Sequence, residues 1–262
     1  MPWRALLSCP PPLVRAGAAL AVMAALAASI PSPAASTAAA APSLAGKVVT
    51  IDPGHNGGNA SHPDEINKLV PMGGGKTKAC DTTGTETNDG KLTEFAFALD
   101  VALRLRTILQ SQGAKVVMTR TTSLGVGPCI DERARIGNAA HSDAAISIHG
   151  DGGPPSGRGF HVIRPKGVSG QSKPLLAASD LLGRRVRTAL RAKGYRPATY
   201  IGIAGLDLRD DLGGLNLSKV PKVLVEMGNM RNSADATLMK SPAQRQRMAV
   251  ALATALSVDL TH

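Results

Sequence analysis

Three titratable side chains stand at the ends of short apolar segments, where an open α/β sheet collects its functional groups. They are His55 after residues 47–52, His149 after 144–148 and Glu226 after 222–225. Because the carboxyl ends of parallel strands share one edge of a sheet, we expect these side chains to converge. Imidazole and carboxylate groups gathered in one place can bind a metal ion or transfer a proton.

Glu94 is expected at the same edge because it begins a helical pattern. Apolar residues recur at helical spacing from Phe95 to Leu109, and a helix crossing back from the first strand must begin near that strand's carboxyl end. Gly54 and Gly150, beside the two histidines, allow close approach of a ligand. Two imidazoles and one carboxylate are the ligand set of a catalytic zinc with an open fourth position. The alternative is a purely structural role, which is the commoner role of a single histidine at a strand end.

The elements that must position these side chains are alternating strands and helices. Apolar, β-branched segments predict strands at 47–52, 115–119, 144–148, 159–164 and 222–225. Helical spacing predicts helices at 94–112, 131–140, 173–193 and 244–256. This alternation predicts an α/β fold, with a mainly parallel twisted sheet and helices on both faces, in a single domain. Residues 56–91 show no periodicity, so we expect a long functional or mobile loop there.

Residues 1–41 have the pattern of a secretory signal peptide and its processing region. Arg4 and Arg15 form a basic start, residues 16–30 are apolar and mostly Ala, and residues 32–41 offer small-residue cleavage sites. The apolar run is shorter than the roughly 20 residues of a spanning helix, so we expect no stable membrane anchor. We therefore predict export to the periplasm or the cell wall.

The composition restricts the partners of the chain. Its formal net charge is +11, from 30 Lys and Arg against 19 Asp and Glu. Residues 1–41 hold two arginines and no acidic residue, so the mature domain, residues 42–262, carries 28 minus 19, or +9. Three Phe, two Tyr and one Trp are too few for rows of aromatic side chains stacked on sugars or bases. We therefore expect an anionic polymer or surface as the partner, and no nucleic acid.

Cys80 and Cys129 are the cysteines of the mature domain. An oxidising compartment favours a disulfide between them, and closing such a loop stabilises a fold by roughly 4 kcal/mol in the entropic model. Each cysteine follows a predicted strand, at the edge that carries the candidate site. We expect the disulfide to tether the long loop there, with residues 73–75 in a wall or lid over the cleft.

The chain resembles the zinc-dependent N-acetylmuramoyl-L-alanine amidases of the bacterial cell wall, the Amidase_3 type, from about residue 47 to residue 256. The resemblance is carried by IDPGHNG at 51–57, TR at 119–120, DER at 131–133, Asn138 with SD at 142–143, SIH at 147–149 and LVEMG at 224–228. Two positions depart from the family's usual pattern. Phe95 stands where a basic residue is common, and Asp151 where Asn is common.

The resemblance implies one Zn²⁺ per chain, held by His55, Glu94 and His149, with Glu226 as the general base. Glu86 is the alternative glutamate ligand. The implied reaction is hydrolysis of the amide between the lactyl group of N-acetylmuramic acid and L-Ala of the stem peptide, in peptidoglycan or a muropeptide, by a monomer. Bound zinc would acidify water and polarise the substrate carbonyl.

Three further residues are candidates for supporting roles at this site. Asp52 and Asp151 are predicted to contact the ligand imidazoles or to cap turns. Arg133 is predicted to support the ligands or to touch the substrate. A structural ion pair of Glu226 with Arg133 or Arg120 is the alternative to its role as general base.

Two other functions remain compatible with the sequence. A zinc peptidase that cuts within the stem peptide could use the same four side chains. A non-catalytic cell-wall-binding protein would fit the positive charge and the predicted export, but it would not need four converging polar groups. Product mass separates the two enzymes, and metal content separates either from a binding protein.

Overall fold

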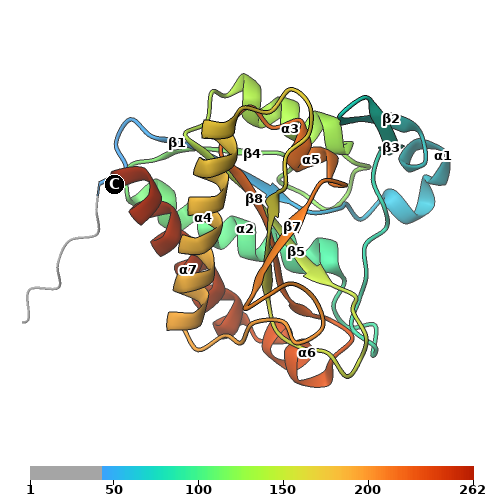
Figure 1. Ribbon diagram of the computed structural model, residues 1–262. Helices are drawn as coiled ribbons and strands as arrows, with labels where there is room; N and C mark the ends of the chain where they lie inside the picture. Colours follow the sequence, from blue (N-terminus) through green and yellow to red (C-terminus); the bar gives the residue numbers. More distant parts are fainter. Residues whose placement is uncertain (1–42) are drawn as a thin grey trace, which may run out of the picture. The chain divides into compact units, whose positions relative to one another are not determined.

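The computed structural model describes residues 43–262, and its helices pack on a six-stranded sheet (Figure 1). In spatial order the strands are β4 (Lys115–Met118), β1 (Val48–Pro53), β5 (Ala144–Asp151), β8 (Lys222–Asn229), β6 (His161–Pro165) and β7 (Leu206–Arg209). The first four strands are parallel to one another. Strand β6 is antiparallel to β8, and β7 is parallel to β6. The prediction of a mainly parallel sheet is confirmed.

The two faces of the sheet differ in chemistry because successive residues of a strand point to opposite sides. In β1, Val49 and Ile51 are fully buried in the hydrophobic core. Thr50, on the other face, shares a hydrogen bond with Ser142 at 2.7 Å, and Asp52 contacts Arg133. One face of the sheet therefore builds the core, and the other carries buried polar side chains toward the site.

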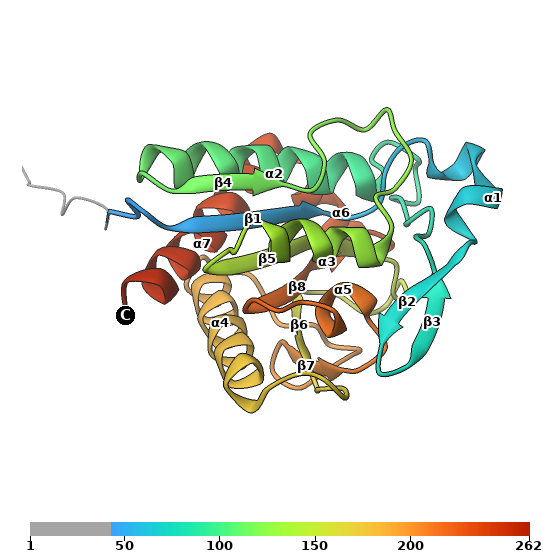
Figure 2. The same cartoon turned by 90° about the horizontal axis from the view of Figure 1, so that it is seen from above.

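Three long helices cover the apolar face: α2 (Glu94–Ser111), α4 (Lys173–Ala192) and α7 (Pro242–Thr261). Helix α2 contacts β1, β4 and β5, while α4 contacts β6 and β8. Helix α7 lies beside both, and Figures 1 and 2 show it running next to α4. Helix α6 (Ser233–Lys240) packs on α7 and β8.

The polar face is covered by two shorter helices, α3 (Ile130–Ala139) and α5 (Gly213–Asn216), which contact each other. Helix α3 contacts β1, and α5 contacts β6 and β8. Helices therefore lie on both faces of the sheet, as expected. On the polar face, residues of α3 and α5 line a cleft.

The segment predicted as a structureless loop, residues 56–91, is partly folded, so that prediction was wrong. It contains η1 (Asn59–Ser61), α1 (Pro63–Ile66) and an antiparallel hairpin of β2 (Leu69–Gly73) and β3 (Lys76–Ala79). Figure 2 shows the hairpin at one end of the molecule, where β2 contacts α3 and α5. Gly73, Gly74 and Gly75 all have positive φ, a conformation that glycine adopts without steric cost and that lets the hairpin turn.

The predicted signal peptide, residues 1–41, lies outside the described residues. Within residues 43–262, no helix is both long enough and apolar enough to cross a membrane.

Candidate active site

Three side chains from separate elements meet at the carboxyl edge of the sheet. His55 follows β1, Glu94 is the first residue of α2, and His149 lies in β5. Glu94 Oε1 is 3.4 Å from His55 Nε2 and 2.8 Å from His149 Nδ1. One ligand atom from each side chain lies within 4.8 Å of the others. The three side chains thus present their donor atoms to one small volume.

Glycines make this convergence possible. A Cβ atom on Gly54 would lie 2.2 Å from the ring of His149. A Cβ atom on Gly84 would lie 2.8 Å from the ring of His55 and 2.9 Å from Glu94 Oε2. Real Cβ atoms do not approach that closely, so any larger residue at either position would displace a member of the cluster. The backbone at Gly54 is therefore packed against His149, and the backbone at Gly84 against His55 and Glu94.

The carboxylate of Glu94 is held on both of its oxygens. Oε2 accepts a hydrogen bond from the backbone N–H of Thr85 at 2.9 Å, while Oε1 faces the histidines. Burial opposes ionisation, but His55 and His149 hold the pKa of Glu94 well below its usual value. Glu86, the alternative ligand, is exposed and lies outside the cluster.

Asp81 is a site residue that the sequence interpretation missed. Its Oδ1 lies 2.8 Å from His55 Nδ1, and its Oδ2 accepts a hydrogen bond from Arg133 at 3.0 Å. Burial alone would lower the pKa of His55, but the carboxylates of Glu94 and Asp81 raise it to about 10. With its Nδ1–H donated to Asp81, the ring can bind a metal ion through Nε2 once that nitrogen gives up its proton.

Asp52 lies at the centre of a buried polar network rather than against an imidazole, so its predicted contact with the histidines was wrong. Its carboxylate accepts hydrogen bonds from Thr119 (2.7 Å), Arg133 (2.9 Å), Ser147 (2.6 Å) and Lys222 (3.0 Å). Burial opposes ionisation, yet Lys222 and Arg133 hold the pKa of Asp52 well below its usual value. This network ties β1, β5, β8, α3 and the residue that follows β4 together beneath the cluster.

Arg133 supports the site from below. Besides Asp52 and Asp81, its guanidinium donates to the backbone carbonyl of His55 at 3.1 Å. The side chain of Arg133 is buried and fully engaged, so its predicted supporting role fits this geometry better than substrate contact does. Arg120 donates to the backbone carbonyls of Pro53, Gly54, Thr122 and Phe95.

Glu226 lies in β8 directly beside His149 in the register of the two strands. Its carboxyl group lines the cleft, and neither Arg133 nor Arg120 is among the hydrogen-bond or ion-pair partners of that carboxyl. Burial, followed by the charges of Glu94 and Asp151, raises the pKa of Glu226 well above its usual value. A carboxyl group with a raised pKa in a cleft is suited to proton transfer near neutral pH.

Asp151 also differs from its predicted role. Its Oδ2 accepts a hydrogen bond of 2.7 Å from the hydroxyl group of Tyr200, and no imidazole is among its hydrogen-bond partners in the described chain. The register of β5 against β8 shifts between His149 and Asp151, and the charge of Asp151 still acts on Glu226.

A cleft of about 240 Å³ opens beside the cluster. His55, His149 and Glu226 line one part of it, and its apolar lining comes from Ala79, Ile130, Ile163, Leu212, Leu215 and Leu224. Lys78 and Arg209 add two cationic groups, both in contact with Asp211. Because Lys78 and Ala79 belong to β3, the hairpin forms one wall of the cleft.

The disulfide predicted between Cys80 and Cys129 is present, with the two Cα atoms 4.3 Å apart. It joins the end of the hairpin to the residue before α3. Asp81 follows Cys80 directly, so the bridge also fixes the chain that carries the carboxylate partner of His55.

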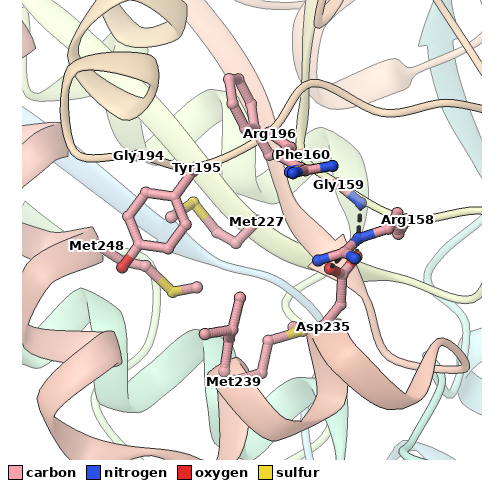
Figure 3. A pocket seen from close by; sticks show the side chains of 11 residues that line it. Arg158, Gly159, Phe160, Gly194, Tyr195, Arg196, Met227, Asp235, Met239 and Met248 are labelled. Atoms are coloured by element: carbon pink, nitrogen blue, oxygen red, sulfur yellow. Dashed lines mark hydrogen bonds and ion pairs between the residues drawn. The ribbon is translucent and has the colours of Figure 1, made fainter.

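A second cavity, of about 90 Å³, is drawn in Figure 3, and it shares no lining residue with this cleft. Met227, Met239 and Met248 form its apolar part with Tyr195, and Asp235 accepts a hydrogen bond from the backbone of Gly159 at 2.6 Å. Met227 follows Glu226 in β8 and therefore points to the opposite face of the sheet. This cavity does not extend to the histidines.

Comparisons with known proteins identify the family to which the chain is similar. The model of the Amidase_3 family, described as N-acetylmuramoyl-L-alanine amidase, matches residues 49–258. The N-acetylmuramoyl-L-alanine amidase Rv3717 of Mycobacterium tuberculosis is 46% identical over 223 residues, which cover 83% of this chain and 88% of the relative.

Two solved structures are also similar. The amidase Ami1 of Mycobacterium smegmatis has 44% sequence identity and a TM-score of 0.78, covering 83% of this chain and 98% of that one. The apo form of Ami1 from Mycobacterium abscessus has 43% identity and a TM-score of 0.78, covering 83% of this chain and 100% of that one. The family match spans nearly all of the described residues, and the chain belongs to the Amidase_3 family of N-acetylmuramoyl-L-alanine amidases.

Proposed function

We propose that this amidase is a zinc enzyme in which His55, Glu94 and His149 hold one Zn²⁺ and Glu226 transfers protons. The observation that carries the proposal is the close approach of the three donor atoms beside a cleft that Glu226 lines. Its substrate is the amide between the lactyl group of N-acetylmuramic acid and L-Ala of the peptidoglycan stem.

The donor set fits zinc. Two imidazole nitrogens and one carboxylate oxygen are the protein ligands of several catalytic zinc sites, which keep a further position open. The hydrogen bond between Asp81 and His55 Nδ1 supports this fit, because ligand histidines usually donate their other ring N–H to a carboxylate or a carbonyl. When bound, zinc lowers the pKa of water and polarises a carbonyl oxygen.

Glu226 supplies the proton transfers that amide hydrolysis needs. Its carboxylate takes a proton from the attacking water as the new C–O bond forms. The same carboxyl group then gives that proton to the L-Ala nitrogen, which leaves as an amine when the C–N bond breaks. Its place beside His149 in the sheet keeps the carboxyl group next to the zinc ligands throughout both transfers.

The cleft fits a peptide better than stacked sugars. Its lining is largely aliphatic, and the lining cations Lys78 and Arg209 can bind carboxylate groups of the stem. We further propose that residues 1–41 direct export, so that the enzyme meets peptidoglycan in the periplasm or the cell wall.

The test combines metal analysis with product mass on purified peptidoglycan. The wild-type protein should hold one zinc per chain and release intact stems that begin with L-Ala, and a chelator should abolish this release. Glu226→Ala should keep zinc and lose about 10²- to 10⁴-fold in kcat, because general acid–base catalysis contributes that much. His149→Ala should lose both zinc and activity.

Glu86→Ala serves as the matched control, because Glu86 is an exposed glutamate on the chain leading to the site. It should retain zinc and turnover. Stems cut internally would identify a peptidase instead. A Glu226→Ala protein with wild-type turnover would remove the proposed role of Glu226.

A further inference from the structure

His161 is a buried histidine of β6 that the mechanism above does not use. It is 1% exposed, and it lies directly opposite Glu226 in the antiparallel pairing of β6 and β8. On the other side of β8, the partner of Glu226 is His149. Residues that face each other across paired strands project to the same face of the sheet. His149, Glu226 and His161 therefore form one row across three strands, with Glu226 in the middle.

Two polar atoms in this row are buried and unpaired. Within the described part of the chain, neither Glu226 Oε2 nor His161 Nδ1 has a hydrogen-bond partner. Facing residues of an antiparallel pair have Cβ atoms about 5 Å apart, which places these two side chains within reach of each other. Buried polar atoms in folded proteins almost always have a hydrogen-bond partner. Two such atoms without a partner, on facing residues, therefore indicate a hydrogen bond that forms between them in the active enzyme.

The surroundings of His161 restrict what else it could do. Its ring stands perpendicular to the ring of Tyr200, with the centroids 6.2 Å apart, and the hydroxyl group of Tyr200 is committed to Asp151. The Tyr200 ring lies so close to Gly153 and Gly157 that a Cβ atom on either would come within 2.6 Å of it. His161 is also absent from the lining of the cleft. It therefore lies beside Glu226 and outside the set of residues that line the cleft.

We propose that His161 is a positioning residue for Glu226. His161 Nδ1–H donates a hydrogen bond to Glu226 Oε2, and this bond aims the other oxygen, Oε1, at the attacking water in the cleft. The inference rests on the proposed role of Glu226 and adds to it the group that orients the carboxylate.

The kinetic test compares three variants on a soluble muropeptide. His161→Phe keeps the ring volume and removes the donor, and it should lower kcat at least about 10-fold with little change in KM, because misplaced catalytic groups cost up to about 10²-fold. His161→Gln retains an N–H donor and should recover most of kcat. His62→Phe, at an exposed histidine outside the cleft, should behave as wild type. All variants should keep one zinc and the wild-type melting temperature.

A second readout does not depend on turnover. In ¹⁵N-labelled protein, NMR should show the proton of His161 on Nδ1, with slow exchange, and its chemical shift should move in Glu226→Ala. A proton on Nε2 alone would overturn the proposal. A chemical shift that stays the same in Glu226→Ala would overturn it too. Equal loss of kcat in His161→Phe and His161→Gln would also overturn it. Wild-type activity in Glu226→Ala would instead refute the role of Glu226, whereas the NMR result would still report whether the pair exists.

Discussion

Asp81 holds the ring of His55 from the side away from Glu94, and this contact sets how the ring can bind a metal. If the cluster binds zinc as proposed, Asp81→Ala should weaken zinc affinity about 10- to 100-fold, as the loss of such a partner does in known zinc sites. Asp81→Asn keeps an oxygen acceptor for the Nδ1–H and should lose less. Competitive titration with a zinc chelator measures the affinity.

Asp64→Ala, at an exposed aspartate of α1, is the control for this series and should bind zinc as wild type does. Unchanged affinity in Asp81→Ala would show that the orientation of His55 does not depend on Asp81.

Asp52 should make the fold sensitive to acid. Its folded-state pKa lies well below its usual value, because Lys222 and Arg133 outweigh the burial that opposes ionisation. A depressed pKa contributes stability above the unfolded-state value of about 3.9, and this contribution is lost as the pH falls below that value. Asp52→Asn should therefore lower the free energy of unfolding by about 3 kcal/mol at pH 7, since it leaves buried cations without their partner.

The difference between wild type and Asp52→Asn should shrink as denaturant unfolding is repeated from pH 6 down to pH 2. Asp64→Asn should show no such difference at any pH. A gap between wild type and Asp52→Asn that stays constant to pH 2 would mean that the charge of Asp52 is not its source.

Among single residues, those that follow a strand could be predicted from the sequence. Those placed only by contacts between distant segments could not. His55, His149 and Glu226 follow apolar segments, and the carboxyl ends of parallel strands converge whatever the loops do. Asp81 lies in an irregular segment, and its contact with His55 depends on a hairpin that no local pattern specifies, although the disulfide beside it was predictable.

The helices and strands also differ in whether they could be predicted from the sequence. Helix α2 was predictable because Ala98, Ala102, Leu105 and Leu109 recur at helical spacing, and all four lie on its buried face. Strands β2 and β3 were missed because they are short and mostly exposed, with Leu69 72% exposed and Met72 the buried residue of β2. The reversal of β6 also escaped prediction, since strand direction depends on the path of the connecting chain and not on the residues of the strand.

The disulfide fixes the hairpin against α3 and should contribute strongly to stability. Replacing both cysteines, as Cys80→Ser with Cys129→Ser, should lower the free energy of unfolding by up to about 4 kcal/mol, because the open loop gains entropy when unfolded. Activity should fall as well, since Asp81 follows Cys80 directly. Denaturant unfolding and turnover of a muropeptide measure the two effects.

Reductant should reproduce both effects in the wild-type protein and have no effect on the double variant. Unchanged melting and kinetics after verified reduction would show that packing of the hairpin on α3 and α5 holds the wall of the cleft without the bridge.

The charged residues of the whole molecule fall into a buried, paired set and an exposed, mostly positive set. The charges beneath the cluster are paired with one another in the buried network of Asp52, Arg133, Asp81 and Lys222. The excess positive charge lies elsewhere, for example on the exposed side chains of Arg191, Lys193 and Arg196. Buried pairs are screened little by salt, whereas exposed charges are screened within about 10 Å at 0.1 M ionic strength.

Salt should therefore affect docking on the wall more than catalysis. Residues 42–262 carry a formal charge of +9, and whole peptidoglycan is a polymer of carboxylated stems. Raising the salt concentration from about 50 to 500 mM should lower kcat/KM on insoluble peptidoglycan several-fold, because screening weakens long-range attraction. On a soluble muropeptide with a single stem, kcat/KM should change little. R191E combined with K193E should reproduce the effect of salt on the insoluble substrate at low salt and leave the soluble one unaffected. If salt lowered kcat/KM equally on both substrates, the attraction would act at the cleft, and Lys78 and Arg209 would be the cations responsible.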